Sequence, residues 1–371
     1  MQISTTITEV VNHFDCAADA STFQPYGSGH INDTFLLKNV DDAGPDYLLQ
    51  RINHTIFNNV EKLMDNMQQV TAHLKNKLIA QGGDPMKEVM TLIPSISGQY
   101  YYQDSSGNFW RMMYFMQDTR SYDLVTTQKQ AYEGGKAFGK FQAMLSDLSS
   151  DKMYEVIPDF HNIKVRLGHL EEAVAKDLSG RAGEVQMELD LVNKHADAML
   201  YFQQPSQLAG LPKRVIHNDT KFNNVLLNNN DEAQCVIDLE TVMEGYVAYD
   251  FGDAIRSIIN TSTEDEADLD KIQLNMPLFN AYTRGYLEYA SQFITETEIQ
   301  SLIKGVLLLP FMQGVRFLTD HINGDTYFKI KFPGHNLQRA RAQFQLFNRL
   351  NAHSGEMNET ILKEISRAYL P

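Results

Sequence analysis

One polar stretch between two short apolar runs constrains this chain more than any other part of it. It reads VIHNDTKFNNVLLNNNDEAQCVID and ends at Asp238. Val225–Leu227 and Cys235–Ile237 are typical of short strands, and the polar residues between them have the composition of a turn. A hairpin centred near residue 231 would place Asn224 opposite Asp238 at its open end. A carboxamide and a carboxylate are oxygen ligands of the kind that hard cations such as Mg²⁺ prefer.

The spacing of the polar residues upstream of this hairpin is specific. Asp219 follows His217 by two residues, and Lys221 and Asn224 follow Asp219 by two and by five. The catalytic loop of protein kinases has this spacing, and a later strand there supplies a metal-binding Asp. The alternative is a polar loop in which Asp219 and Asn224 only make turn hydrogen bonds. Agreement at all of these positions, Asp238 included, favours the catalytic interpretation.

This spacing assigns a role to each residue, because phosphoryl transfer needs positioning and charge neutralisation more than covalent chemistry. We predict Asp219 as the base that orients and deprotonates the attacking hydroxyl. Lys221 is predicted to meet the moving phosphoryl group. Asn224 and Asp238 are predicted to hold Mg²⁺ against the phosphates of ATP.

A glycine turn near the start of the chain is the candidate phosphate loop. Gly27, Ser28 and Gly29 stand between Tyr26 and an apolar run, which predicts a tight turn between two strands. Glycine allows backbone conformations that direct N–H groups at phosphate. A simple hairpin turn would use the same residues, and Asn32 stands where kinases have a third glycine.

The next predicted strand, Tyr47–Asn53, carries a phosphate-binding lysine in protein kinases but has none here. It offers Gln50 and Arg51, which point to opposite faces of a strand. Gln50 is the candidate, and which residue holds the alpha and beta phosphates stays open. Further along, WRMMYFMQD predicts a strand that runs into a crossover segment. There the backbone of Phe115 and Met116 is predicted to bind adenine.

The chain divides into a part rich in strands and a part rich in helices, and 371 residues are long for one compact core. Residues 1–116 combine the predicted strands with a helix over Val60–Leu78, and residues 117–371 are mainly helical. The expected fold is α+β and bilobal, with a small antiparallel sheet in the first lobe. Asp250 and Asp253, at the start of a helical pattern, are expected to brace the catalytic loop through its backbone.

Composition and absent motifs exclude several classes of function. A formal net charge of -15 argues against nucleic acid and anionic membranes as partners. Cys16 and Cys235 are the only cysteines, which suits a reducing compartment. The N-terminus lacks signal-peptide features, and the apolar run Val306–Met312 is too short to span a bilayer. We therefore expect a cytoplasmic protein. The sequence also lacks GxxxxGK[ST], HExxH and GxSxG, which excludes a P-loop kinase and disfavours zinc and hydrolase chemistry.

Seven segments, in order from about residue 24 to 345, carry a wider resemblance: GSGHIND, YLLQRIN, HNDTKFNN, VIDLETVM, YDFGDAIR, MQGVRFLTDHINGDTYF and HNLQRARAQ. The catalytic stretch resembles the aminoglycoside phosphotransferase and choline-kinase superfamily, and the ordered set resembles bacterial N-acetylhexosamine 1-kinases. The resemblance implies a kinase-like fold that binds ATP between two lobes. It implies phosphorylation of the anomeric hydroxyl of N-acetylglucosamine or N-acetylgalactosamine. It also implies a sugar pocket that contains His30, Arg316 and Tyr327.

Two other functions stay open. The first is a kinase of the same fold for an aminoglycoside, an amino alcohol or homoserine, which would favour an acidic pocket. One acidic run is present, with Glu264, Asp265, Glu266 and Asp268. Such a run is more typical of a solvated face. A nucleotide-binding pseudokinase is disfavoured by Asp219, Lys221 and the predicted metal ligands, whereas Gln50 in place of lysine keeps it open. The sequence does not fix the preferred hexosamine, the acceptance of plain hexoses or the oligomeric state.

Overall fold

The computed structural model describes residues 2–27 and 31–369. The chain forms two compact units, each assembled from separate segments. Unit 1 comprises Met1–Ser121, Met144–Pro158 and Asn224–Glu244, and unit 2 comprises Tyr122–Ala143, Asp159–Asn223 and Gly245–Pro371. The predicted α+β class, a small antiparallel sheet followed by a helical region, is confirmed. The division into lobes 1–116 and 117–371 was predicted from function and stays a prediction. The compact units follow different bounds, because residues 144–158 and 224–244 belong to the same unit as the sheet.

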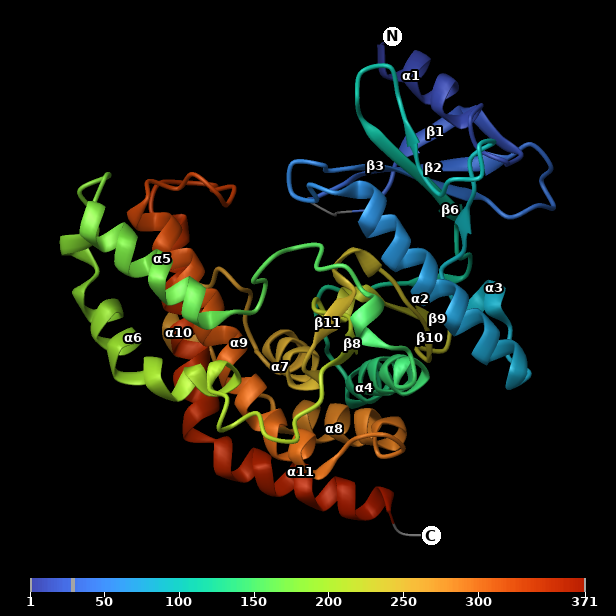
Figure 1. Ribbon diagram of the computed structural model, residues 1–371. Coiled ribbons are helices and arrows are strands. Elements are labelled where there is room, and N and C mark those ends of the chain that lie inside the picture. Colours follow the sequence, from blue (N-terminus) through green and yellow to red (C-terminus); the bar gives the residue numbers. More distant parts are fainter. Residues whose placement is uncertain (1, 28–30, 370–371) are drawn as a thin grey trace. The chain divides into compact units, whose positions relative to one another are not determined.

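Unit 1 contains an antiparallel sheet with the strand order β1-β2-β3-β6-β4, and β5 pairs with β6 (Figure 1). Its strands are β1 (Ala18–Pro25), β2 (Asp33–Asn39), β3 (Tyr47–Ile52), β4 (Leu92–Ile93), β5 (Tyr102–Gln103) and β6 (Phe109–Tyr114). The predicted strands on either side of the glycine turn and at Tyr47–Asn53 are confirmed. Ser28, Gly29 and His30 lie outside the described residues.

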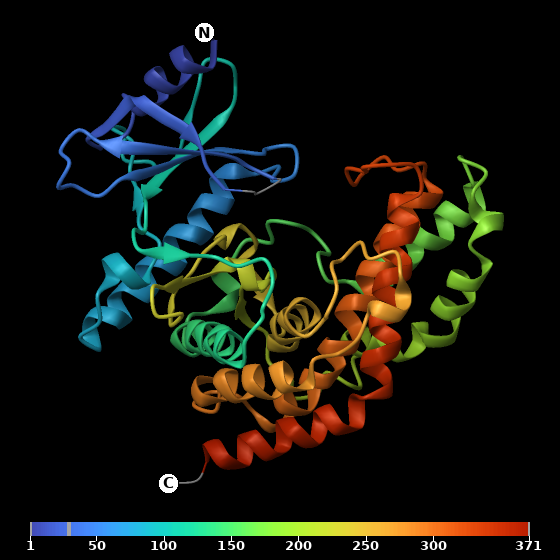
Figure 2. The same ribbon diagram turned by 180° about the vertical axis from the view of Figure 1, so that it is seen from behind.

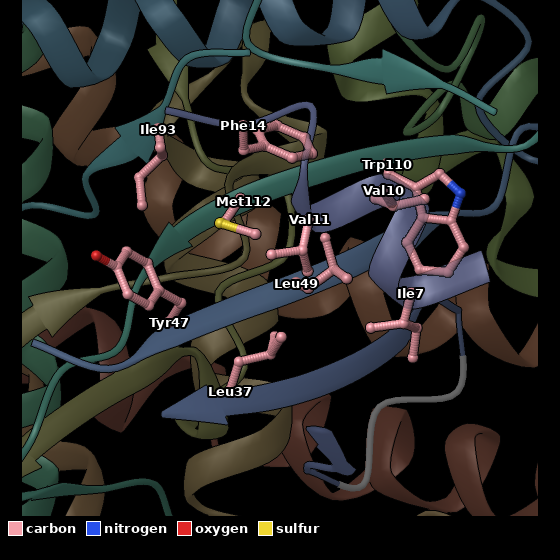
Figure 3. Packing of buried hydrophobic residues seen from close by; sticks show 10 residues of the cluster. All are labelled: Ile7, Val10, Val11, Phe14, Leu37, Tyr47, Leu49, Ile93, Trp110 and Met112. Carbon is pink, nitrogen blue, oxygen red and sulfur yellow. The ribbon is translucent and has the colours of Figure 1, made fainter. Parts of the chain in front are cut away.

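The two faces of this sheet differ, because successive side chains of a strand alternate between them. Leu49 and Met112 point to the face covered by α1 (Gln2–Val11), where they join a buried apolar cluster with Ile7 (Figure 3). Arg111, next to Met112, points to the opposite face and reaches Met67 of α2 (Val60–Ala80). The face towards α1 is therefore mainly apolar, whereas the opposite face carries the buried charge of Arg111.

A second sheet of unit 1 holds the predicted metal ligands. It consists of β7 (Thr119–Arg120), β9 (Val225–Asn228) and β10 (Ala233–Val236) in the order β10-β9-β7. The β9–β10 hairpin is confirmed, but a register shift between Ala233 and Cys235 makes it asymmetric. The Ile237 N–H donates to the Asn224 carbonyl at 2.9 Å. Asn224 thus lies opposite Ile237, and the predicted pairing with Asp238 is wrong by one residue because a bulge takes up an extra residue.

Unit 2 is mainly helical, and α5, α9 and α10 lie side by side in both views (Figure 1 and Figure 2). Its elements are α4 (Gln128–Leu145), α5 (Ile163–Lys176), α6 (Gln186–Met199), β8 (Arg214–Ile216), α7 (Val247–Ile258), α8 (Met276–Ala290), α9 (Glu296–Ile322), α10 (His335–Ala352) and α11 (Ser354–Ala368). Two further short elements are α3 (Pro85–Glu88) and β11 (Met243–Gly245), and short 3-10 turns occur elsewhere. By length and composition α9 could cross a membrane, but 72% of its most apolar window is buried in the fold, as in the core helix of a globular unit.

Helices α7 and α9 cross at very close range, and glycine permits this approach. A Cβ atom on Gly305 of α9 would collide with the backbone carbonyl of Ala248 in α7. A Cβ atom on Gly252 of α7 would collide with the Gly305 carbonyl. The crossing fixes the helix that carries Asp250 against the helix that carries Arg316, so the two predicted functional regions of unit 2 have a common rigid support.

Candidate active site

The predicted base and its neighbouring cation lie together in the loop after β8. Lys221 Nζ is 3.1 Å from Asp219 Oδ2, and these side chains are 41% and 25% exposed, so both are open to a ligand. The backbone N–H of Asp219 donates to His217 Nδ1 at 3.2 Å. His217 is fully buried and lies against the rings of Phe138 and Phe141. The aromatic packing anchors the loop, while its functional groups remain accessible.

Asp250 of α7 braces this loop, as the sequence predicts. Its carboxylate accepts the backbone N–H of Asn218 at 2.7 Å and that of His217 at 2.9 Å. It also accepts a hydrogen bond from Gln142 at 2.8 Å. Burial raises the pKa of Asp250, although His217 and the three donors act in the opposite direction. Asn218 has φ 66°, and such left-handed backbone persists when surrounding contacts enforce it.

Tyr26, which precedes the predicted glycine turn, contacts the predicted adenine-binding segment within unit 1. The ring of Tyr26, next to Gly27, packs edge-on against Phe115 with the ring centroids 5.3 Å apart. Gly27 has φ 78°, as a tight turn requires. The Phe115 N–H already donates to the Asp46 carbonyl at 2.8 Å. A backbone contact from Phe115 to adenine would therefore use its carbonyl, and the donor would come from Met116 or beyond.

Gln50 and Arg51 point to opposite faces of β3, as predicted. Gln50 Oε1 accepts hydrogen bonds from Arg111 at 2.8 and 2.6 Å, and its Nε2 donates to Thr34 Oγ1 at 3.0 Å. Arg51 forms an ion pair with Asp33, in which both side chains are about half exposed. The structure therefore gives Arg51 a surface role and leaves Gln50 as the candidate for the phosphates.

The predicted metal ligands, Asn224 and Asp238, lie at the open end of the β9–β10 hairpin. Asp238 has φ 64°, a strained conformation that for a non-glycine residue often marks a functional position. Two residues later, Glu240 is 3% exposed, and its Oε2 has no hydrogen-bond partner within the described part of the chain. Glu240 was not among the predicted site residues, although the DLE triplet of VIDLETVM could have indicated it.

The donor chemistry of this corner fits a hard divalent cation. Asn224, Asp238 and Glu240 supply oxygen ligands, and Mg²⁺ commonly takes one or two carboxylates and completes its shell with phosphate and water. Burial alone would raise the pKa of Glu240, but the Arg111 guanidinium and a hydrogen bond with Asp238 lower it to about 2. Among residues 2–27 and 31–369, no group of three or more His, Cys, Asp or Glu residues suits a metal.

The structure brings Arg316 and Tyr327, two of the residues predicted for the sugar pocket, together within unit 2. Arg316, on α9, donates to Gln313 Oε1 at 3.0 Å. Its guanidinium lies 5.4 Å from the ring centroid of Phe328 and 6.0 Å from that of Phe160. Burial lowers the pKa of Arg316, and a hydrogen bond with Tyr327 opposes this shift. A desolvated guanidinium among aromatic rings is suited to bind a polar ligand with apolar surfaces.

One carboxylate holds the loop that carries Tyr327. Asp320 is 5% exposed and accepts the backbone N–H groups of Thr326 at 2.9 Å, Tyr327 at 2.8 Å and Phe328 at 2.9 Å. Asn336 of α10 donates to the same carboxylate at 2.9 Å. The backbone position of Tyr327 is therefore set by Asp320, while its side chain, 68% exposed as a whole residue, remains available.

Two further residues near Arg316 were not predicted. Arg166 donates to the carbonyls of Asp159 and Phe160 at 3.0 and 3.2 Å, and burial followed by the charge of Arg316 lowers its pKa. Burial lowers the pKa of His161 to about 4, so its ring is neutral near pH 7. Arg166 Nε and His161 Nδ1 are buried, and neither has a hydrogen-bond partner among the described residues. The segment DFHNIKVR has no motif spacing that could have identified them.

The acidic run does not form an open acidic pocket. Glu264 pairs with Arg256 at 3.0 Å, and Asp265 pairs with Lys331 at 3.0 Å. Asp268 accepts the N–H of Asp270 at the start of a short helical turn. Cations or backbone N–H groups of this chain therefore already engage these carboxylates.

Comparison with known proteins supports a class for this fold and site. A model of the phosphotransferase enzyme family (APH) matches residues 22–289, so the chain belongs to this family. It is therefore a small-molecule phosphotransferase of the aminoglycoside phosphotransferase and choline-kinase superfamily.

Solved structures with low sequence identity share the fold. An aminoglycoside phosphotransferase from Alicyclobacillus acidocaldarius is 13% identical, with 97% of this chain and 95% of that chain covered and a TM-score of 0.56. A choline kinase from Cryptosporidium parvum is 14% identical, with 95% of each chain covered and a TM-score of 0.58. The amicoumacin kinase hAmiN, solved with AMP-PNP, Ca²⁺ and Ami, is 12% identical, with 93% of this chain and 92% of that chain covered and a TM-score of 0.58.

Proposed function

We propose that this phosphotransferase transfers the γ-phosphoryl group of ATP to the anomeric hydroxyl of N-acetylglucosamine or N-acetylgalactosamine. The products would be the sugar 1-phosphate and ADP. The seven ordered segments that resemble N-acetylhexosamine 1-kinases motivate this acceptor. The charge of the acceptor-side residues of unit 2 is the structural observation that carries the proposal.

The acceptor side combines two guanidinium groups with aromatic rings. The charge of Arg316 lowers the pKa of Arg166, second to burial, so the two cations lie close enough to repel each other. The carboxylates of Glu264 and Asp265 are already ion-paired. A cationic acceptor such as choline or an aminoglycoside would be disfavoured here. A neutral sugar can accept hydrogen bonds from arginine and can lie against the ring of Tyr327.

The proposed step needs one base. The anomeric hydroxyl is more acidic than the other hydroxyls of a sugar, because the ring oxygen withdraws electron density. Its O–H bond breaks, the proton passes to Asp219, and the oxygen forms a bond to the γ-phosphorus. The bond between that phosphorus and the bridging oxygen breaks, and ADP leaves with the electron pair. Lys221, 3.1 Å from Asp219, is suited to neutralise charge on the moving phosphoryl group.

We assign the nucleotide to residues of unit 1, with Gly27 and Gln50 at the phosphates and Phe115 and Met116 at adenine. Mg²⁺, held by Asn224 and Asp238, would supply charge neutralisation at the phosphates. Binding of His30 to the sugar, a cytoplasmic location and the absence of nucleic-acid and membrane partners remain predictions.

A methyl glycoside tests the position of phosphorylation. Methyl N-acetylglucosaminide lacks a free anomeric hydroxyl, so it should compete with the free sugar and release no ADP above background. The product from free N-acetylglucosamine should be non-reducing, and its phosphorus NMR signal should couple to the anomeric proton. Phosphorylation of the methyl glycoside, or coupling to the C6 protons, would show that another position is phosphorylated and that the proposal is wrong.

A panel of acceptors separates the remaining possibilities. Free sugars, choline, ethanolamine, homoserine and an aminoglycoside are compared by coupled ADP release at equal concentrations. Activity with a cationic acceptor and none with either hexosamine would replace the proposed substrate. Nucleotide binding without ADP release for any acceptor would support a pseudokinase and contradict an active kinase.

A further inference from the structure

The candidate phosphate residue Gln50 lies directly opposite a buried arginine in the sheet of unit 1. Strands β3 and β6 are antiparallel, and Gln50 on β3 is the register partner of Arg111 on β6. Arg111 Nε and Nη2 both donate to Gln50 Oε1, at 2.8 and 2.6 Å. Arg111 is only 1% exposed, so water does not compete for this pair of hydrogen bonds.

The other contacts of Arg111 are also with protein groups. Its Nη2 forms an ion pair with Glu240, and its Nη1 lies 3.0 Å from the sulfur of Met67 on α2. Glu240 Oε1 also accepts from Asn32 at 2.8 Å. The guanidinium is thus enclosed by a strand, a helix and the segment after Asp238, and at 1% exposure a ligand cannot reach it directly.

This arrangement fixes the orientation of the Gln50 side chain. A carboxamide has one acceptor oxygen and two N–H donors, whereas a guanidinium only donates. Gln50 must therefore turn its oxygen to Arg111 and its NH₂ group away. One N–H donates to Thr34 at 3.0 Å, and the described structure gives the other no partner.

We propose that Arg111 is a positioning residue for the nucleotide: it orients Gln50 so that a neutral N–H donor, instead of a lysine ammonium, meets the phosphates. Through Glu240, which follows Asp238 by two residues, the same guanidinium connects the β3–β6 pair to the predicted metal corner. This inference rests on the proposed ATP-dependent function. It answers for this chain which group takes the place of the missing lysine.

The buried ion pair has more than a stability role in this account. Taking two charges out of water costs more than their attraction returns unless further hydrogen bonds complete the geometry. Here Gln50 and Asn32 complete it, one on each partner. Arg111, on the neighbouring strand, thus carries the positive charge that a kinase lysine presents to phosphate. Glu240 neutralises this charge, so Arg111 acts on the ligand only by orienting Gln50.

Nucleotide binding in a double-mutant cycle tests this role without an acceptor. Arg111→Lys keeps a cation for Glu240 but loses the planar fork that grips Gln50. Gln50→Ala removes the presented donor and leaves the ion pair intact. Each change should raise the Kd for AMP-PNP with Mg²⁺ by about 10- to 100-fold, the range for one hydrogen bond to a charged group. In the Gln50→Ala background, Arg111→Lys should have almost no further effect.

Arg51→Lys is the matched control, because Arg51 is adjacent to Gln50 and its ion pair is exposed. Its Kd should stay within about twofold of wild type. Melting temperatures show whether the Arg111→Lys variant is folded. The Kd of Gln50→Ala still tests the inference if that variant is not folded. Equal effects of Arg111→Lys in both backgrounds, or wild-type affinity of Gln50→Ala, would overturn the inference and leave the kinase function standing. Failure of the wild type to bind AMP-PNP would overturn both.

Discussion

The two units each bury a carboxylate beside their predicted functional residues, and the two carboxylates are stabilised in different ways. Glu240 of unit 1 faces the Arg111 guanidinium, and its pKa falls to about 2 despite burial. Asp250 of unit 2 accepts two backbone N–H groups and one carboxamide N–H, and burial still raises its pKa. The Arg111 guanidinium overcomes the cost of desolvating Glu240, whereas His217 and three hydrogen-bond donors do not overcome that cost for Asp250.

The difference fits what each unit is proposed to do. Unit 1 would hold a highly charged ligand, and its own buried cation is neutralised by Glu240 and kept away from solvent. Unit 2 would hold a neutral ligand, and the carboxylates that act on Arg316 and Arg166, Glu264 and Asp159, oppose the fall of their pKa values less than burial lowers them. Each mutation below should therefore change properties of one ligand only.

The largest effect is expected at Asp238. Asp238→Asn removes a carboxylate from the proposed cation corner of unit 1, so turnover should fall to background. Measured by ADP release over a range of Mg²⁺ and Mn²⁺ concentrations, the loss should not be rescued, and circular dichroism should show an intact fold. Wild-type turnover that persists in excess EDTA would contradict the metal assignment.

The second effect belongs to the base of unit 2. Asp219→Asn keeps the shape of the side chain and removes the proton acceptor, which typically costs about 10²–10⁴ in rate. The loss should appear in kcat, with the Kd for AMP-PNP unchanged, since Asp219 is assigned to the acceptor. A variant that retains most of the wild-type kcat would exclude Asp219 as the base.

The third effect concerns the acceptor alone. Arg316→Ala removes charged hydrogen bonds of about 1.5–3 kcal/mol, so the KM for the sugar should rise about 10- to 150-fold and the KM for ATP should change little. Arg284→Ala is the control, because Arg284 is exposed and also lies over an aromatic ring, at 4.9 Å from the centroid of Tyr132. Equal changes in both KM values would indicate that Arg316 is structural and would remove the contrast between the units.

The last effect is on how the free energy of unfolding depends on pH, and it does not involve a ligand. The folded-state pKa of Glu240 is about 2, below the ordinary 4.5, so its contribution is fully present above pH 4.5 and is lost as the pH falls towards 2. This loss should be on the order of 3 kcal/mol in the free energy of unfolding. Glu240→Gln should flatten this part of the stability profile in urea titrations. Asp250, whose pKa is raised, has the opposite effect, because its destabilising contribution decreases as the pH falls. An unchanged stability profile in Glu240→Gln would show that Glu240 makes no such pH-dependent contribution, and the contrast with Asp250 would be lost.

Local spacing predicted the parts of the site that depend on local structure. Asp219 and Lys221 are two residues apart in one loop, and the structure brings their charged groups together. Asp250 could also be predicted as a brace, because an acidic residue at the start of a helix commonly accepts backbone N–H groups. The register of the β9–β10 hairpin could not, since one bulge residue moves every later pairing.

Residues that act through tertiary contacts escaped the sequence analysis. Arg111 lies 61 positions after Gln50, and only strand pairing brings the two side chains together. Within FWRMMY, Arg111 is the one charged residue of an apolar strand. This pattern indicates that Arg111 has a buried partner but does not identify that partner. Arg166 and His161 have no motif at all, and only their burial and their nitrogen atoms without a hydrogen-bond partner among the described residues identify them as candidates.

The hold of Asp320 on three consecutive backbone N–H groups has a consequence for how the acceptor range of such an enzyme could evolve. Because the loop is fixed through its main chain, the identity of residue 327 is nearly uncoupled from folding. Substitutions there should alter the choice of acceptor and leave melting temperature almost unchanged, whereas Asp320→Ala should lower it. If the proposed function holds, position 327 would be a site where substitutions change substrate preference without a compensating mutation.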